Sequence, residues 1–258
     1  MQLQALQAFE DNYIWMLSRD GDAWVVDPGD ASPVIHALDA QSLRLSGILI
    51  THHHGDHTGG VATLQAAHPE ALVYGPANEP LKFPHQAVRE GDTVDVFGTG
   101  FRVLDIPGHT AGHIAYFAEV ADDAPLLFCG DTLFYGGCGR VFEGTPAQMW
   151  TSLQKLMALP GATRVCCAHE YTLANLRFAQ AVDPNNSDLQ TAVANCQALR
   201  AQGQSTLPST IAHELRINPF LRCASPEARA AARAQAGQDL NNDSAVFAAL
   251  REWKNNFR

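Results

Sequence analysis

The stretch THHHGDHTGG, residues 51–60, constrains this chain more than any other segment. It contains four histidines and follows the apolar run Gly47 to Ile50. A short apolar run between polar segments predicts a buried strand, which places the histidines on a loop at its carboxyl end. Histidine is the commonest metal ligand and a frequent acid–base catalyst, so the loop predicts a chemically active site.

The spacing within the loop indicates metal binding. Alternate side chains of an extended loop point to one side, so His52 and His54 can converge on one ion. Asp56 and His57 then face a second position nearby, and we expect His53 to point the other way and to pack or hydrogen-bond. Imidazole nitrogen and carboxylate oxygen suit zinc, and also iron or manganese. A polar loop with incidental histidines is the alternative, and the spacing disfavours it.

One loop cannot complete the coordination of two ions, and three later strand ends offer further candidates. His109 follows an apolar strand that ends at Ile106. Asp131 follows the run 126–128, and His169 follows the run 163–168. Each is a strand, then a single His or Asp, then a turn, which is how loops at one sheet edge build a shared site. Each of these residues alone is weak evidence for a metal ligand. Together with the histidine loop, the three are strong evidence for a shared metal site.

The rest of the chain indicates an α+β protein with a helical C-terminal part. Arg19-Asp20-Gly21-Asp22 separates two apolar runs and predicts a hairpin. After Tyr171 the sequence becomes rich in Ala, Gln and Leu with helical period, so we expect domains at 1–171 and 172–258. Ser225 and Pro226 predict an N-cap and first turn. Helices are expected over 32–39, 61–67, 146–159, 173–182, 188–202, 226–236 and 244–255.

The composition and net charge indicate a globular protein and exclude some classes of partner. The chain has 258 residues, of which 46% are hydrophobic and 17% charged, as in an ordinary globular protein. A formal charge of -10 argues against nucleic-acid or anionic-membrane partners. No signal peptide or membrane span is visible, so we expect a cytoplasmic location. The six cysteines form no CxxC pair, and buried reduced thiols are expected.

These motifs together resemble the metallo-β-lactamase superfamily and, within it, the hydroxyacylglutathione hydrolases, also called glyoxalase II. The resemblance extends from Phe9-Glu10-Asp11-Asn12-Tyr13 through the histidine loop to the end of the chain. It includes the stretches PGHTAGH (107–113), GDTLF (130–134), GGCGR (136–140), CAHEYT (167–172), NPFLR (218–222) and REWKN (251–255). The resemblance implies an αββα sandwich followed by a small C-terminal α-helical domain.

The resemblance also implies a binuclear metal site. His52, His54 and His109 would hold the first ion, and Asp56, His57 and His169 the second, with Asp131 bridging both. We therefore expect two divalent metal ions per chain, zinc foremost, with iron or manganese as alternatives. Asp56 and Asp131 are the predicted catalytic residues. His113, one turn beyond His109, is predicted to play a structural part.

The implied reaction is hydrolysis of an S-(2-hydroxyacyl)glutathione, such as S-D-lactoylglutathione, the second step of methylglyoxal detoxification. An activated water attacks the thioester carbonyl, and an ion stabilises the developing oxyanion. Glutathione is anionic, so an acidic protein needs basic side chains at the binding site to bind it. The resemblance assigns substrate binding to Arg140, Tyr171, Arg251 and Lys254. Phe142 stands where some relatives have a tyrosine that contacts glutathione.

Five alternative functions can be weighed against this pattern. A β-lactamase would carry Cys where Asp131 stands, and a lactonase is opposed only by the basic pair Arg251 and Lys254. A persulfide dioxygenase would hold one iron by two His and one Asp. A nuclease is disfavoured by the negative charge, and a non-enzymatic module by the full ligand set. We expect a monomer whose partner is its small-molecule substrate.

Overall fold

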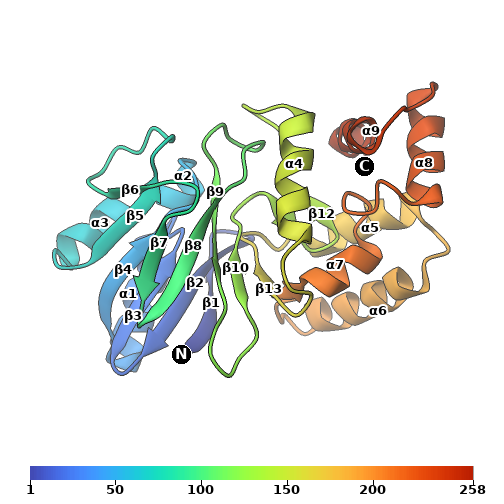
Figure 1. Cartoon of the computed structure of the whole chain (residues 1–258). Helices are drawn as coiled ribbons and strands as arrows, with labels where there is room; N and C mark the ends of the chain where they lie inside the picture. The colour runs from blue at the N-terminus through green and yellow to red at the C-terminus, as the bar shows by residue number, and fades with distance from the viewer. Residues whose placement is uncertain (258) are drawn as a thin grey trace. The chain divides into compact units, whose positions relative to one another are not determined.

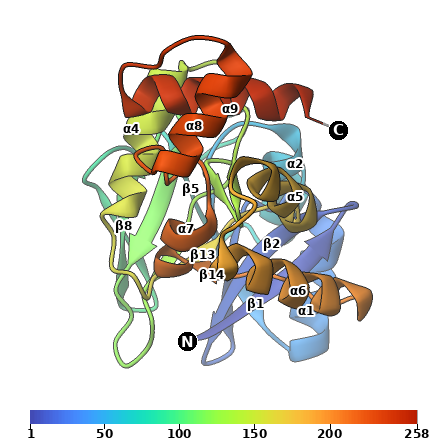
Figure 2. The same ribbon diagram turned by 90° about the vertical axis from the view of Figure 1, so that its right-hand side faces the viewer.

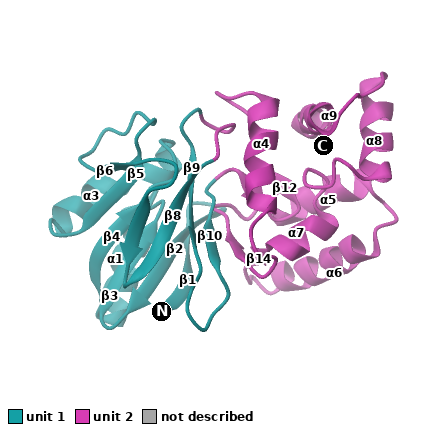
Figure 3. Cartoon of the chain, in the orientation of Figure 1, with its two compact units in different colours: residues 1–105, 111–130 teal, residues 106–110, 131–258 magenta. Residues whose placement is uncertain are grey.

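The chain forms two compact units, which are coloured separately in Figure 3, and the computed structural model describes residues 1–257. The first unit comprises Met1–Asp105 and Ala111–Gly130, and the second comprises Ile106–Thr110 and Asp131–Arg258. The predicted domain boundary after Tyr171 lies within the second unit and stays a prediction. Within residues 1–257, each helix is too short or too polar to cross a membrane.

The first unit contains a six-stranded sheet in the order β1-β2-β3-β4-β5-β6 (Figure 1). The first three strands pair antiparallel and the last four pair parallel. Parallel neighbours need crossover connections, which α1 (Ala31–Gln41) and α3 (Val61–Ala67) provide. The carboxyl ends of β3 and β4 therefore meet at one sheet edge. The strands are β1 (Gln2–Ala8), β2 (Asn12–Arg19), β3 (Asp22–Val26), β4 (Arg44–Leu49), β5 (Leu72–Pro76) and β6 (Gln86–Val88).

Both faces of this sheet are buried. Ile14 and Met16 of β2 belong to the hydrophobic cluster that includes side chains of α1 and α3. Trp15 and Leu17 alternate with them, so they lie on the opposite face, and both are buried. This explains why β2 is apolar at almost every position.

A second group of strands packs against that opposite face. Four antiparallel strands run in the order β10-β9-β8-β7. Tyr116 of β9 donates its hydroxyl to the carbonyl of Ile50, just beyond β4, at 3.1 Å. The strands are β7 (Thr93–Val96), β8 (Thr99–Asp105), β9 (Ile114–Ala118) and β10 (Leu126–Phe128). The first unit is thus a two-sheet sandwich with α1 and α3 on the outer face of the six-stranded sheet.

The second unit is mainly helical. Its strands are the hairpin β11 (Leu133–Phe134) and β12 (Gly137–Cys138) and the pair β13 (Arg164–Cys166) and β14 (Ser209–Thr210). α8 and α9 lie side by side in Figure 2, as do α5 and α6. The helices are α4 (Pro146–Met157), α5 (Thr172–Val182), α6 (Ser187–Ala201), α7 (Ile211–Ile217), α8 (Pro226–Ala236) and α9 (Asp243–Asn256).

Helix caps explain where several of these helices begin. Thr145 and Gln148 form a capping box at the start of α4. Ser225 accepts a hydrogen bond from the backbone N–H of Ala228, which confirms the predicted start of α8. α7 was not predicted from the sequence.

Candidate metal centre

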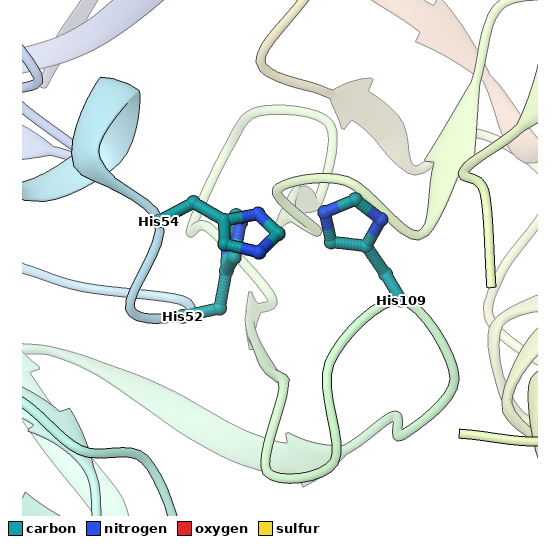
Figure 4. Close-up of side chains that lie close together, drawn as sticks. All are labelled: His52, His54 and His109. Atoms are coloured by element: carbon teal, nitrogen blue, oxygen red, sulfur yellow. The ribbon is translucent and has the colours of Figure 1, made fainter. Parts of the chain in front are cut away.

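The histidine loop follows β4 and is anchored by Asp27, the residue after β3. The buried Asp27 carboxylate accepts hydrogen bonds from the Thr51 N–H at 2.8 Å and the Thr51 hydroxyl at 2.7 Å. It also lies 3.0 Å from Nδ1 of His57, while the Thr51 hydroxyl lies 3.0 Å from Nδ1 of His52. Both rings are therefore held through Nδ1, so Nε2 is the nitrogen of each ring that could bind a metal ion. Nε2 of His52 lies 3.1 Å from Nδ1 of His54, and Figure 4 shows the two rings together.

Asp56 and His57 form a second pair of donors on α2 (Gly55–Thr58). Oδ2 of Asp56 lies 3.5 Å from Nε2 of His57 and accepts a hydrogen bond from Asn12 at 3.1 Å. The loop rests closely on the turn after β3, because a Cβ on Gly29 would lie 1.8 Å from the Asp56 carbonyl oxygen. Any larger residue at position 29 would displace Asp56.

Two further buried polar residues, Glu79 and His113, contact the histidine loop. Glu79 is buried, and its carboxylate contacts both the N–H and the ring of His53. Its other oxygen accepts a hydrogen bond from the Gly112 N–H at 2.7 Å. The expectation that His53 hydrogen-bonds away from the ligands is confirmed. His113 is fully buried and stacks on His52 with ring centroids 4.5 Å apart, which fits its predicted structural part.

The second unit places one carboxylate between two imidazoles. Oδ2 of Asp131 lies 3.3 Å from Nε2 of His109, and Oδ1 lies 3.3 Å from Nε2 of His169. His109, also labelled in Figure 4, follows β8, and its Nδ1 lies 2.9 Å from the carbonyl of Arg140. Each Asp131 oxygen thus faces a different ring nitrogen, as a bridging carboxylate does.

The distances between paired donors fit a tetrahedral metal ion. Two ligand atoms about 2.0–2.1 Å from one tetrahedral ion lie roughly 3.3–3.4 Å apart. Within the two units, four donor pairs are separated by 3.1, 3.5, 3.3 and 3.3 Å. Most of these separations are long for hydrogen bonds, but all suit neighbouring ligands of one ion. The donor set therefore fits divalent metal.

Buried polar side chains hold the hairpin that joins Asp131 to Arg140. Glu214 of α7 is fully buried and accepts hydrogen bonds from the Gly136 N–H at 2.8 Å and from Asn218 at 2.9 Å. Asn218 also donates to the carbonyl of Gly137 at 2.9 Å. Burial raises the pKa of Glu214 to about 7, against a smaller lowering by the hydrogen bonds from Asn218 and Gly136.

Three predicted substrate residues lie near the surface of the second unit. The Arg140 side chain is exposed, while its carbonyl faces His109. Phe142 is exposed and lies edge-on to the His109 ring, 5.2 Å between centroids. Tyr171 is partly exposed and stacks on the His169 ring at 4.7 Å. Aromatic rings therefore flank both His109 and His169.

Arg251 and Lys254 both lie on α9 but in different surroundings. Arg251 is only 5% exposed, and its guanidinium donates to the Cys138 carbonyl at 2.8 Å and lies over the Phe220 ring. Lys254 is half-buried, and its ammonium donates to the Ala174 carbonyl at 3.2 Å. Burial, and after it the positive charges of Arg251, Arg177 and Arg140, together lower the pKa of Lys254 to about 8.

Sequence analysis missed several residues of the site. Asp27 and Asn12 carried a signal, because Asp27 directly follows a predicted strand and Asn12 belongs to one of the quoted motifs. The only sequence signal for Arg177 was that it is a basic residue in an otherwise apolar predicted helix. Glu214 and Asn218 lie on or beside a helix that was not predicted. All six cysteines are buried thiols, as expected.

Two family models match consecutive parts of the chain. The metallo-beta-lactamase superfamily matches residues 9–169, and the hydroxyacylglutathione hydrolase C-terminus matches residues 170–257. The hydroxyacylglutathione hydrolase of Cupriavidus taiwanensis is 55% identical over 266 residues, which cover 100% of both chains.

Solved structures show the same fold. ETHE1 from Myxococcus xanthus is 25% identical, with a TM-score of 0.65 and coverage of 98% of each chain. A protein solved in a di-iron-bound form is also 25% identical, with a TM-score of 0.60 and coverage of 84% of this chain and 98% of that one. These similarities confirm the predicted metallo-β-lactamase-like fold with a C-terminal helical region.

Proposed function

Because the chain belongs to the hydroxyacylglutathione hydrolase family of the metallo-β-lactamase superfamily, we propose that it hydrolyses S-(2-hydroxyacyl)glutathione thioesters. S-D-lactoylglutathione is the expected substrate, and glutathione and a 2-hydroxy carboxylate are the products. The observation that carries this proposal is Asp131, whose two oxygens each lie 3.3 Å from a different histidine nitrogen.

We propose that the chain binds two metal ions through the ligand set that its family implies. His52, His54, His109 and Asp131 would hold one ion. Asp56 and His57 would join His169 and Asp131 around the other. The support is that every donor pair has the spacing of neighbouring tetrahedral ligands. Zinc is the expected metal, with iron or manganese as alternatives.

Ions bound there supply Lewis acidity toward the thioester carbonyl and an acidified water for attack on it. The protein's part is to hold the donors and to orient the water, for which Asp56 is placed by Asn12. No strong general acid is needed for the leaving group, because a thiol is far more acidic than an alcohol or an amine.

The glutathione moiety would bind the cations of the second unit. Arg140 and Lys254 are the exposed and half-buried members of this group, and Tyr171 can donate its hydroxyl. Arg251 is buried against Cys138, so we expect it to act mainly by holding the segment that carries Arg140. A cytoplasmic location, a monomeric state and the absence of nucleic-acid partners stay predictions.

The test is steady-state hydrolysis of S-D-lactoylglutathione with metal quantified on the same sample. Rapid loss of thioester absorbance with two metal ions per chain is the expected result. Two bound ions without turnover would assign the function to another hydrolase of the superfamily, such as a lactonase. One iron per chain would favour a dioxygenase instead.

A further inference from the structure

A surface hollow of the first unit lies beside one of the proposed metal ligands. It has a volume of about 470 Å³ and is lined by Phe9, Glu10, Asp11, Asn12, Gly55 and Asp56. Small-molecule sites in proteins commonly have volumes of about 300–1,000 Å³. The hollow is therefore large enough for a small organic group.

Phe9 gives this hollow an apolar wall in an unfavourable backbone conformation. It lies at the tip of the β1–β2 hairpin with a φ of 51°, and its side chain is 60% exposed. The exposed ring leaves an apolar surface that an apolar group of a ligand could cover.

The hollow is continuous with the donor pair on α2. Asn12 lines it and donates a hydrogen bond to Oδ2 of Asp56 at 3.1 Å. That oxygen lies 3.5 Å from Nε2 of His57, the other donor of the pair. A carbonyl group reacting beside this pair would have its substituent within reach of Phe9.

The charges around the hollow favour particular substituents. The Glu10 side chain is exposed at the hollow, and no lysine or arginine is among its lining residues. A second carboxylate on the substrate would come close to Glu10, and like charges destabilise binding. An uncharged apolar substituent would instead contact the Phe9 ring.

We propose that this hollow is the acyl subsite, and that it favours uncharged 2-hydroxyacyl groups with an apolar tail over acyl groups that carry a second carboxylate. The inference rests on the proposed thioester hydrolysis. Phe9 would set the preference for the acyl tail, and Glu10 would disfavour anionic acyl groups. An aryl tail such as that of a mandeloyl group would contact the Phe9 ring more extensively than the methyl group of lactoyl.

The test compares kcat/KM for S-lactoyl-, S-mandeloyl- and S-succinylglutathione in the F9A, E10Q and F97A variants. Phe97 is the matched control, since it also has a left-handed backbone, with a φ of 57°, at a hairpin turn but does not line the hollow. We expect F9A to lower the mandeloyl-to-lactoyl ratio about tenfold. We expect E10Q to raise kcat/KM for the succinyl thioester about threefold relative to the lactoyl thioester. F97A should change neither ratio.

A second readout separates this inference from the proposed function. Binding of mandelate, the corresponding product, is measured by calorimetry on the metal-loaded wild type, F9A and F97A. Weaker mandelate binding in F9A alone supports the subsite even if no thioester is hydrolysed. The inference is overturned if F9A leaves both the ratio and mandelate binding unchanged. It is equally overturned if the wild type binds no mandelate and hydrolyses no thioester.

Discussion

The histidine loop of the first unit and the Asp131–Arg140 segment of the second unit are held in place by different kinds of contact. Asp27 anchors the histidine loop from a neighbouring strand end, 24 and 30 positions away from Thr51 and His57 in the sequence. The Asp131–Arg140 segment is held by Glu214 and Arg251, which lie 78 and 113 positions from their partners.

Because of this difference, mutations should affect the histidine loop and the Asp131–Arg140 segment in different ways. The histidine loop depends on a sheet edge that forms as soon as β3 and β4 pair. The Asp131–Arg140 segment depends on helices α7 and α9, so its geometry requires the C-terminal part to be folded. Damage to α7 or α9 should therefore affect metal binding from a distance, whereas damage to the histidine loop should act locally.

The largest effect is expected for D131A. Asp131 is the one proposed ligand shared by both ions, so its loss should reduce both metal content and turnover. We expect activity to fall by more than the roughly 100-fold typical of losing a ligand's hydrogen-bond partner. Metal analysis and kinetics on the purified variant check this, with the exposed D39A as control. Retention of two ions per chain would disprove the bridging assignment.

Two variants, D27N and N218A, test the difference between the histidine loop and the Asp131–Arg140 segment. D27N removes the carboxylate that holds His57 directly and His52 through Thr51. We therefore expect about 10- to 100-fold weaker binding of the ion that His57 would hold, and a smaller loss for the ion that His52 would hold. N218A loosens the segment that carries Asp131, so both ions should bind more weakly. It should also lower the free energy of unfolding by about 1–3 kcal/mol, because buried carbonyls lose their donor. Competitive chelator titrations resolve the two ions. If N218A releases ions no more readily than wild type, the hydrogen bonds of Asn218 are not needed to position Asp131.

A smaller effect is expected for K254M, which tests substrate binding in the second unit. Loss of the ammonium should raise KM for S-D-lactoylglutathione roughly tenfold with unchanged metal content. Since the pKa of Lys254 is about 8, wild-type KM should rise as pH increases through that value, as the ammonium loses its charge. K254M should lack this rise. A KM profile that keeps it would assign the titration to another group.

The smallest effect on turnover is expected for E214Q, which instead alters stability. The pKa of Glu214 is raised from its ordinary 4.5 to about 7, so the folded state binds more protons than the unfolded state between these values. Wild-type stability should therefore fall as pH rises through this window, by on the order of 3 kcal/mol relative to E214Q. Urea unfolding at a series of pH values measures the difference, with the exposed E227Q as control. Parallel curves for wild type and E214Q would contradict the expectation.

The sequence by itself determined the local parts of the site. The spacing of His52, His54, Asp56 and His57 indicated two metal positions, because the geometry of one short loop depends on near neighbours. His109, Asp131 and His169 were recognisable because each follows an apolar strand. The α+β class, the hairpin after Arg19 and the helices of the C-terminal part were likewise visible in short-range patterns.

Only the tertiary structure decided how those donors are supported. The predicted basic pair on α9 separates into a buried Arg251 that holds Cys138 and a half-buried Lys254 with a lowered pKa. Glu214 gave no signal, because its segment was not predicted to be a helix and Gly136, the hairpin residue that it holds, lies 78 positions away in the sequence. Phe9 looked like an ordinary hairpin residue until its backbone and the hollow beside Asp56 were seen. Periodicity encodes which residues face a core, but contacts between distant segments arise only when the chain has packed.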